Sequence, residues 1–383
     1  LINEIKPQLQ DSLRLRIGGD SKIGVMFSGG IDSGLLTSLM LNILDKDQIN
    51  LYTSHNYTPG GQINNDLKFA KNFAKQLNLN LIEVVNEDHS EKNLLDNLLK
   101  LTYFSELPIN YLMSSMITNQ VTKKMAENKI KVMIDGTGGD EIMGGYPNTR
   151  SLVMANAMNR NWSSTLLYLK YWLEENQFPI VGSSRLIIEV MKVYIFNLNR
   201  HISMNPIILN SLDKFKNPKI IQSIKYLDQN FYFRNNLCTA LERQLFEIFK
   251  YQLGFYLGTS DIFSMANSVE NRSPYLDYRL IKYSSIPEKF NKKNGYNKYL
   301  LRKMFPKNYD KNFVYRKKKE GIGINFKKTI LNDNTSFDFI ADSSFNRELM
   351  NIEYIKNDFN QKQIFTKFLT AFAALDHNYG ITL

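Results

Sequence analysis

Apolar residues recur with two different spacings along this 383-residue chain. In the first part, short apolar runs typical of buried strands are separated by segments whose apolar residues recur at helical spacing. The strand-like runs are 22–27, 49–55, 79–85 and 130–135, and the helical segments between them are 34–44, 65–77 and 111–128. Strands that alternate with helices predict an α/β fold with a doubly wound parallel sheet.

The strand pattern fades after about residue 150, and helical patterns run through 162–176, 183–200, 235–257 and 364–375. The sequence therefore predicts three units. A linker or entry helix occupies 1–20, an α/β core occupies 21–150, and a mainly helical part at 151–383 completes the site of the core.

Composition favours a soluble protein of a reducing compartment. No run of 18 or more apolar residues is present, and the first residues lack the layout of a signal peptide. The single cysteine, Cys238, excludes an intrachain disulfide. The four histidines are scattered, so a zinc site of the usual spacing is not expected. We expect a cytoplasmic protein that does not bind a membrane.

The formal charge of +11 is concentrated in one stretch. Residues 282–328 hold 15 Lys and Arg against three acids, a local charge of +12. Such a stretch indicates an anionic partner such as nucleic acid, a nucleotide or pyrophosphate. A solvated lysine-rich face explains the same stretch, and both interpretations stay open at this point.

The first strand-like run leads into a polar, glycine-rich loop, SGGIDS at 28–33. Gly29 and Gly30 let the backbone approach a bound group, and the helix that follows directs N–H groups at an anion. Ser28 and Ser33 add hydroxyl donors. Asp32 would repel phosphate unless a cation lies between them, which indicates a Mg²⁺ ligand. The alternative is a turn whose aspartate caps the helix.

A second glycine-rich loop, IDGTGGDEIMGGYP at 134–147, follows the fourth strand-like run. It carries the acidic pair Asp140 and Glu141. Carboxylates from two strand ends that meet over one phosphate site would suit a Mg²⁺–pyrophosphate leaving group. The alternative is an exposed loop with capping acids.

Four motifs together resemble a known family. SGGIDS is similar to the pyrophosphatase loop of the N-type ATP pyrophosphatases, which cleave ATP between its α and β phosphates. The second loop resembles the SGEGSDE…GGY loop of the asparagine synthetase family. Residues 264–290 resemble its SMAxSxExRxPFLD segment, and 298–306 with 315–326 resemble its K-x-x-L-R and R-x-K-x-G elements.

This resemblance implies an adenine-nucleotide alpha-hydrolase (PP-loop) fold, with residues 21–150 as the nucleotide-binding core. It also implies a reaction that uses ATP and Mg²⁺. In the family, a small carboxylic acid attacks the α-phosphorus of ATP and pyrophosphate leaves. Ammonia then attacks the resulting acyl-adenylate, which gives an amide and AMP.

The resemblance also implies roles for individual residues. Metal ligands would be Asp32 and Asp140, and Gly136 would lie beside the adenosine. Lys298 and Lys318 would act catalytically at the phosphates. Glu270 would orient or deprotonate the amine, or else pair with Arg272. Residues that would bind the nucleotide or its pyrophosphate are Ser28, Gly29, Gly30, Asp32 and Ser33.

Two positions depart from the family pattern. Thr137 stands where asparagine synthetases have a glutamate and β-lactam-forming relatives have a tyrosine. Ile262 replaces the arginine of a DRxSMA element. Threonine cannot act as a carboxylate base, so either another group does that work or the acid substrate is not aspartate.

The source of ammonia is open. Glutamine-dependent members carry an N-terminal glutaminase domain, and residues 1–24 resemble the linker that enters the synthetase domain in such members. We therefore expect a glutaminase domain or subunit, with free ammonia or another amine as alternatives. A homodimer is compatible with the sequence.

Three other functions remain open. One is an intramolecular lactam-forming cyclase of the β-lactam synthetase or lasso-peptide type. The absence of the family glutamate at position 137, where this chain has a threonine, favours it. Another is a tRNA-modifying PP-loop ATPase, although we expect no nucleic acid partner. The third is a degenerate member that acts as a scaffold.

Overall fold

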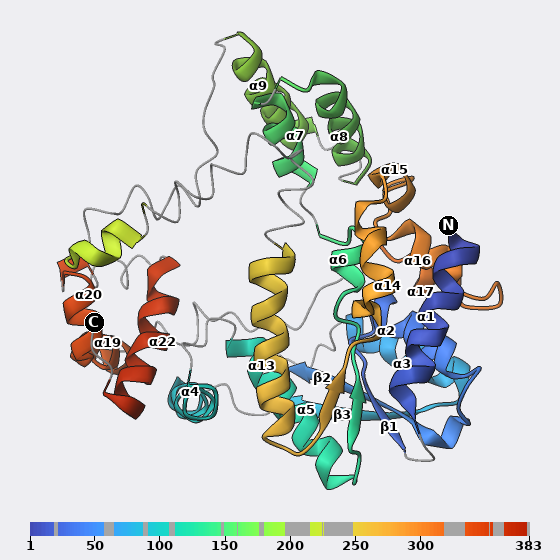
Figure 1. The fold of residues 1–383 in the computed structure, drawn as a ribbon, viewed down its shortest axis with the longest axis horizontal. Helices are drawn as coiled ribbons and strands as arrows, with labels where there is room; N and C mark the ends of the chain where they lie inside the picture. The colour runs from blue at the N-terminus through green and yellow to red at the C-terminus, as the bar shows by residue number, and fades with distance from the viewer. Residues whose placement is uncertain are drawn as a thin grey trace.

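The computed structural model describes residues 1–18, 22–56, 65–86, 91–106, 112–146, 149–158, 160–175, 180–195, 215–223, 225, 248–317, 334–351, 353–354 and 364–380. A five-stranded sheet of order β3-β2-β1-β4-β5 lies at its centre, and all neighbouring strands are parallel (Figure 1). The strands are β1 (Ile23–Met26), β2 (Ile49–Asn56), β3 (Asn80–Asn86), β4 (Val132–Ile134) and β5 (Glu270–Arg272).

The predicted α/β fold class with a parallel sheet is confirmed. The four strands that the sequence predicted form within two residues of their expected ends. The fifth strand was not predicted, because the polar sequence Glu-Asn-Arg of β5 carries no hydrophobic pattern. It also comes from the part of the chain that was expected to be helical, so that part contributes a strand to the sheet.

The helices of the first part mostly match their predicted positions. They are α1 (Ile2–Ile17), α2 (Ile31–Met40), α3 (Asn65–Leu77), α4 (Glu91–Ser105), α5 (Leu112–Glu127) and α6 (Gly139–Met143), with a short 3₁₀ turn η1 (Lys46–Gln48). α2 begins three residues before the prediction, after Gly30 in an extended conformation. Asp32 and Ser33 therefore lie in the first turn of this helix and not in the preceding loop.

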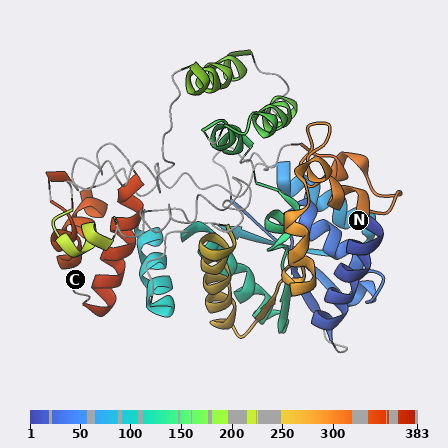
Figure 2. The ribbon, with the colours of Figure 1, turned by 45° about the horizontal axis from the view of Figure 1, so that its top comes forward.

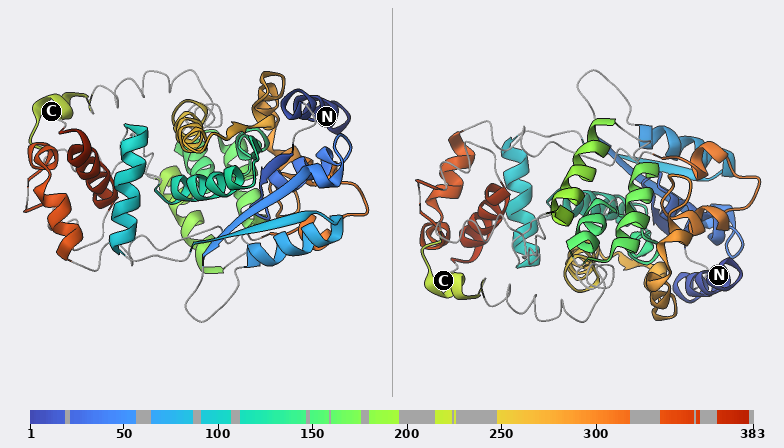
Figure 3. Two further views of the ribbon diagram at one scale, coloured as in Figure 1. Left: turned by 90° about the horizontal axis from the view of Figure 1, so that it is seen from below. Right: turned by 90° about the horizontal axis from the view of Figure 1, so that it is seen from above.

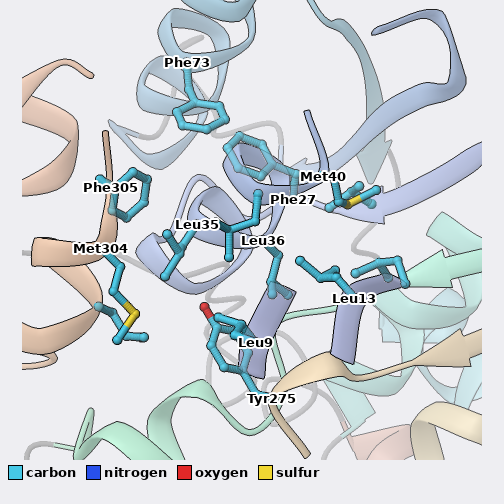
Figure 4. Packing of buried hydrophobic residues seen from close by; sticks show 14 of the residues in the cluster. Leu9, Leu13, Phe27, Leu35, Leu36, Met40, Phe73, Tyr275, Met304 and Phe305 are labelled. Atoms are coloured by element: carbon cyan, nitrogen blue, oxygen red, sulfur yellow. The ribbon is translucent and has the colours of Figure 1, made fainter. Parts of the chain in front are cut away.

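Helices cover both faces of the sheet. On one face, α1, α2 and α3 bury a large apolar cluster that includes Leu9, Leu36 and Phe73. Figure 4 shows the rings of Phe27 and Phe73 side by side, with centroids 5.0 Å apart. On the other face, Val121 and Met125 of α5 pack against Met133 of β4. Burial on both faces explains why the inner strands β1 and β4 consist of apolar residues and glycine.

α1 is part of the same core as the sheet. Its buried side chains recur at helical spacing, at Ile5, Leu9, Leu13 and Ile17. The apolar cluster that contains them also contains β1 residues. Arg16 near its C-terminus pairs with Asp277 at 3.1 Å, which ties the helix to the segment after β5.

The second part of the chain is mainly helical. Its helices and helical turns are α7 (Thr149–Met158), α8 (Trp162–Glu175), α9 (Ile180–Ile195), η3 (Ile248–Leu253), α13 (Gly254–Met265), η4 (Pro274–Leu276), α14 (Tyr278–Ile281), η5 (Lys282–Ser285), α15 (Glu288–Asn291), α16 (Tyr299–Met304), α17 (Lys311–Val314), α19 (Asn334–Asp342), α20 (Ser344–Leu349) and α22 (Ile364–Tyr379). Cys238 and most of the predicted helix at 235–257 lie outside the described residues.

Two groups of helices stand apart from the sheet. α7, α8 and α9 pack around Leu152, Tyr168 and Leu186 and project from one end of the molecule (Figure 2). α4 lies between α5 and α13 on one side and the C-terminal helices α19, α20 and α22 on the other (Figure 3). No helix in the described ranges is long and apolar enough to cross a membrane.

The segment from η4 to α17 returns to the sheet and packs over α2. Phe305 and Phe313 of this segment join the same apolar cluster as Leu35 of α2. Figure 4 shows Phe305 and Leu35 in this cluster. A Cβ atom on Gly34 would lie 2.7 Å from the Phe313 ring, so only glycine permits this approach. This packing places the described part of the basic stretch, residues 282–317, against the end of the sheet where α2 begins.

Leu9→Ala should destabilise the protein by about 2–5 kcal/mol, because it removes a side chain that is 1% exposed from the main core. Leu15→Ala on the same helix is the control, since Leu15 is 68% exposed. Urea denaturation followed by circular dichroism measures both. Equal losses for the two variants would contradict the packing of α1 against the sheet.

Candidate active site

The loops after β1 and β4 meet at the carboxyl edge of the sheet, because these strands are neighbours and parallel. A Cβ atom on Gly136 would lie 3.0 Å from Cβ of Asp32, and one on Gly139 would lie 2.6 Å from its Oδ1. The glycines of the second loop therefore let the first turn of α2 lie against it.

Two aspartates from these loops share one ammonium group. Lys298 Nζ lies 2.5 Å from Asp32 Oδ2 and 2.7 Å from Asp140 Oδ1. The Lys298 side chain is 8% exposed, that of Asp32 13% and that of Asp140 38%. The cluster is thus sealed on the Lys298 side and open on the Asp140 side.

The two carboxylates hold Lys298 in its charged form. Burial acts to lower the pKa of Lys298, but the charges of Asp32 and Asp140 and their hydrogen bonds outweigh burial and raise it. A buried amine without such partners would lose its proton far more readily. The cluster therefore contains a fixed positive charge between two negative ones.

The backbone around Lys298 is specialised for this contact. Lys298 has a positive φ of 50°, which non-glycine residues adopt only rarely. Arg302 donates to the carbonyl of Asn297 at 2.8 Å and to that of Val314 at 2.5 Å. Burial lowers the pKa of Arg302 to about 10. This guanidinium therefore ties the turn before α16 to the last residue of α17.

The first glycine loop is held from the other side. Gly29 has a φ of +68°, and a Cβ atom there would lie 2.6 Å from the carbonyl oxygen of Asp66. Asp66 forms a buried ion pair with Arg316 at 2.9 Å, and the Arg316 guanidinium lies 4.5 Å from the centre of the Phe69 ring. Arg316 therefore braces α3, on which the loop rests.

Glu141, the second acid of the pair in the second loop, has a structural role. Its carboxylate accepts from the backbone N–H of Gly138 at 3.0 Å and from the Tyr146 hydroxyl at 2.7 Å. Burial raises the pKa of Glu141. It thus caps α6 and fixes the loop that carries Asp140.

Asp135, at the end of β4, is a buried hydrogen-bond acceptor that the sequence analysis missed. It accepts from the hydroxyl of Thr137 at 2.8 Å and from that of Ser273 at 2.6 Å. It also accepts from the backbone N–H of Thr137 at 3.2 Å and from the Asn271 amide at 3.0 Å. The carboxylate therefore joins the second loop to β5 and the residue after it.

Most of the predicted site residues lie together in the structure. Those in or beside the cluster are Asp32, Asp140, Lys298, Gly136, Thr137 and the loop residues Ser28, Gly29, Gly30 and Ser33. Tyr275 is buried, and its hydroxyl donates a 3.1 Å hydrogen bond to the backbone carbonyl of Asp32. Lys318 lies outside the described residues.

Glu270 is not brought to the cluster. It pairs with Val132 at the start of β4, away from the carboxyl edge, and its side chain is 56% exposed. Both of its carboxylate oxygens accept from Arg272, at 2.8 and 2.9 Å, and this pairing lowers the pKa of Glu270. The ion pair to Arg272, one of its two expected roles, is the one that the contacts support.

A divalent metal would find two carboxylates here. Within the described ranges, no group of three or more His, Cys, Asp or Glu residues could hold a metal ion. Asp32 and Asp140 nevertheless direct one oxygen each at a single cationic nitrogen. Mg²⁺ is commonly bound by one or two carboxylates with phosphate and water completing its shell. The donor set therefore fits such an ion only together with a phosphate ligand.

Arg302 was also missed as a contributor, although it is the arginine of the K-x-x-L-R pattern. Asp135 had a weaker signal, since it is one acid directly before a glycine loop. Neither side chain could be assigned its partners from the sequence, because those partners come from β5 and from residues 297–316.

Comparison with known proteins gives one family. The profile of the asparagine synthase family matches residues 4–377. The chain is 26% identical over 322 residues to the glutamine-hydrolysing asparagine synthetase 1 of Bacillus subtilis (strain 168), which covers 79% of this chain and 46% of that protein. It is 25% identical over 324 residues to asparagine synthetase 2 of the same organism, covering 83% and 38%. The chain spans less than half the length of either relative.

A solved structure, the U34-tRNA thiolase NcsA from Methanococcus maripaludis with its 4Fe-4S cluster, matches with a TM-score of 0.27 and 13% identity. The match covers 66% of this chain and 78% of the thiolase. A likeness this low carries no argument about function.

Gly145→Ala should destabilise the protein by about 1–3 kcal/mol through overpacking, because the new Cβ would lie 1.8 Å from Asp140 Oδ1 and 2.1 Å from Lys298 Cε. Gly258→Ala is the control. It lies in α13 with nothing within 4 Å of its Cβ position, so it should stabilise the helix by up to about 1 kcal/mol. Thermal denaturation that ranks the two variants the other way would contradict the described cluster.

Proposed function

The chain belongs to the asparagine synthase family, and from this membership and the site geometry we propose that it is an ATP-dependent carbon–nitrogen ligase. It activates a small carboxylic acid as an acyl-adenylate, with release of pyrophosphate. It then transfers a nitrogen nucleophile to the acyl carbon, which yields an amide and AMP.

The single observation that carries this proposal is the meeting of Asp32, Asp140 and Lys298. The three groups come from the loops after β1 and β4 and from a segment far along the chain, yet both carboxylates lie within hydrogen-bonding distance of the Lys298 ammonium group. A triphosphate split between its α and β phosphates needs concentrated positive charge at the leaving pyrophosphate. The cluster supplies one such charge and two ligands for another.

Asp32 and Asp140 would hold Mg²⁺, and the ion, when bound, would neutralise charge on the pyrophosphate that leaves. Its carboxylate ligands need to be held in place before the nucleotide arrives. Asp32 is fixed by the first turn of α2 and by the glycines of the second loop, and Asp140 is fixed by α6. This pre-organisation lowers the cost of reorganising charge during the reaction.

Lys298 and the glycine loop would act on the phosphates. The N-terminal turn of α2 presents backbone N–H groups and the positive end of its dipole at the loop formed by Ser28, Gly29 and Gly30. Lys298 would share its ammonium group between the aspartates and the phosphate oxygens. Because its pKa is raised, it carries its charge throughout the physiological pH range.

We propose ammonia as the nitrogen nucleophile. The matched relatives from Bacillus subtilis are named as glutamine-hydrolysing, which supports glutamine as its source through a glutaminase domain or subunit. Aspartate is one candidate acid, and Thr137 at the position of the family glutamate leaves the acid open. No contact among the described residues favours the lactam-forming cyclase or the tRNA-modifying ATPase.

The reaction can be tested with a screen of carboxylic acids supplied with ATP, Mg²⁺ and ammonia or glutamine. We expect pyrophosphate, AMP and amide in equal amounts for the true acid. When the acid carries a heavy oxygen isotope in its carboxylate, AMP should contain one labelled oxygen, because the carboxylate attacks the α-phosphorus. Release of ADP and inorganic phosphate would contradict the proposal.

Asp140→Asn and Lys298→Met should each lower the rate of pyrophosphate release by about a hundredfold or more, because each removes a charge fixed at the leaving group. Asp47→Asn and Lys303→Met are matched controls, since both residues are exposed, whereas the Lys298 side chain is only 8% exposed. Rates for the cluster variants that match those of the controls would contradict the assigned roles.

A further inference from the structure

The second loop carries an acid and a hydroxyl in an unusual order. Its sequence is Asp135-Gly136-Thr137, whereas the family pattern quoted above has Ser-Gly-Glu at these three positions. The hydroxyl and the carboxylate have thus exchanged places. In the structure they remain in contact, because Thr137 Oγ1 donates to Asp135 Oδ2 at 2.8 Å.

Asp135 is fully occupied as an acceptor. Oδ1 accepts from the Thr137 N–H and from Ser273 Oγ, and Oδ2 accepts from Thr137 Oγ1 and Asn271 Nδ2. Each carboxylate oxygen has two acceptor positions in its plane, so these four bonds fill them. Asp135 is also only 5% exposed. It is therefore built to orient its neighbours and not to take up a proton from a substrate.

The contact fixes the polarity of Thr137. A threonine hydroxyl has one proton and two lone pairs, and here the proton is given to a carboxylate. Its oxygen can then only accept a further hydrogen bond. Hydrogen bonding to an ionised group also makes the hydroxyl oxygen a better acceptor. Thr137 is half-buried, and its hydroxyl oxygen keeps lone-pair capacity for a further donor.

A second acceptor lies beside it. Asn271 donates from Nδ2 to the same Asp135 Oδ2 and to Ser260 Oγ, at 3.0 and 2.9 Å. Its Oδ1 is buried and has no hydrogen-bond partner among the described residues. A buried carbonyl oxygen without a donor is costly, and such an atom at a site indicates a ligand that donates. The Asp135 carboxylate therefore has two acceptor oxygens as neighbours.

The loop places these acceptors next to the cluster described above. Thr137 stands between Gly136 and the short helix of Gly139 and Asp140, and Gly136 and Gly139 both lie against Asp32. Ammonia and primary amines carry N–H donors and a lone pair that must point at the acyl carbon. Acceptors that bind the N–H groups would leave that lone pair free.

We propose that Thr137 Oγ1 and Asn271 Oδ1 bind the N–H groups of the nitrogen nucleophile, and that Asp135 is the residue that positions both. This rests on the proposed function. The nitrogen forms the new C–N bond, the C–O bond to AMP breaks, and the proton lost from nitrogen leaves to AMP or to water. Neither Thr137 nor Asp135 takes that proton. The pair thus orients the nucleophile where a family member with glutamate has a charged group.

Thr137→Val tests the acceptor, because valine has nearly the shape of threonine without its oxygen. With ammonia as the nitrogen source, we expect kcat/KM for ammonia to fall about tenfold more than kcat/KM for ATP, the worth of about one hydrogen bond. Thr137→Ser keeps the hydroxyl and should restore most of the loss. Amide is measured by mass spectrometry and pyrophosphate by a coupled assay.

Asp135→Asn tests the positioning residue, because the NH₂ group of asparagine would replace an acceptor oxygen and would face the donors that now bind Asp135. As for Thr137→Val, we expect kcat/KM for ammonia to fall more than kcat/KM for ATP. Asp342→Asn is the matched control, since the Asp342 side chain is 80% exposed. The double variant Asp135→Ser with Thr137→Glu restores the family order and should recover more amide formation than either single variant.

The outcomes separate the two levels of the proposal. If the unmodified chain turns over but Thr137→Val lowers both kcat/KM values equally, or neither, the nucleophile site is wrong and the ligase proposal stands. If the unmodified chain releases no pyrophosphate from ATP with any acid, the proposed function is wrong, and the nucleophile site is then wrong as well.

Discussion

The ammonium group of Lys298 between the carboxylates of Asp32 and Asp140 is the interaction on which the rest of the structure depends. Burying the charges of Lys298 and Asp32 is expensive, and a well-packed apolar cluster of the same volume would usually be as stable. The fold nevertheless surrounds them with glycines at positions 136, 139 and 145, each of which leaves room that a Cβ atom would fill. A gain in folding stability therefore does not explain this cluster, whereas a role in binding charged groups does.

The architecture follows from the need to join these three groups. A parallel sheet brings Asp32 and Asp140 to one edge, because β1 and β4 are adjacent and both end there. Lys298 is 266 residues from Asp32 along the chain, so a long return is required. The apolar packing of Phe305 and Phe313 against α2 and the guanidinium of Arg302 fix that return. The helices between Asp140 and Lys298 include α7, α8 and α9, which pack with one another away from the sheet.

Local patterns in the sequence predicted much of this. The periodicity of 65–77 gave the bounds of α3, and the glycine loops after two strand-like runs indicated where the carboxyl edge lies. The order of the sheet, the strand β5 and the partners of Asp135 could not be predicted. They depend on contacts between distant segments, and β5 has no apolar pattern of its own. The motif that contains Glu270 suggested a position beside the reacting groups. Glu270 instead lies at the start of β5, where its side chain is exposed.

The most direct measurement is a crystal structure of the protein with Mn²⁺ and pyrophosphate, in which anomalous scattering locates the metal. The account predicts one metal position ligated by both Asp32 and Asp140, with pyrophosphate oxygens completing its shell and Lys298 in contact with the phosphates. A metal bound by neither aspartate, or aspartates that separate to distinct sites, would contradict it.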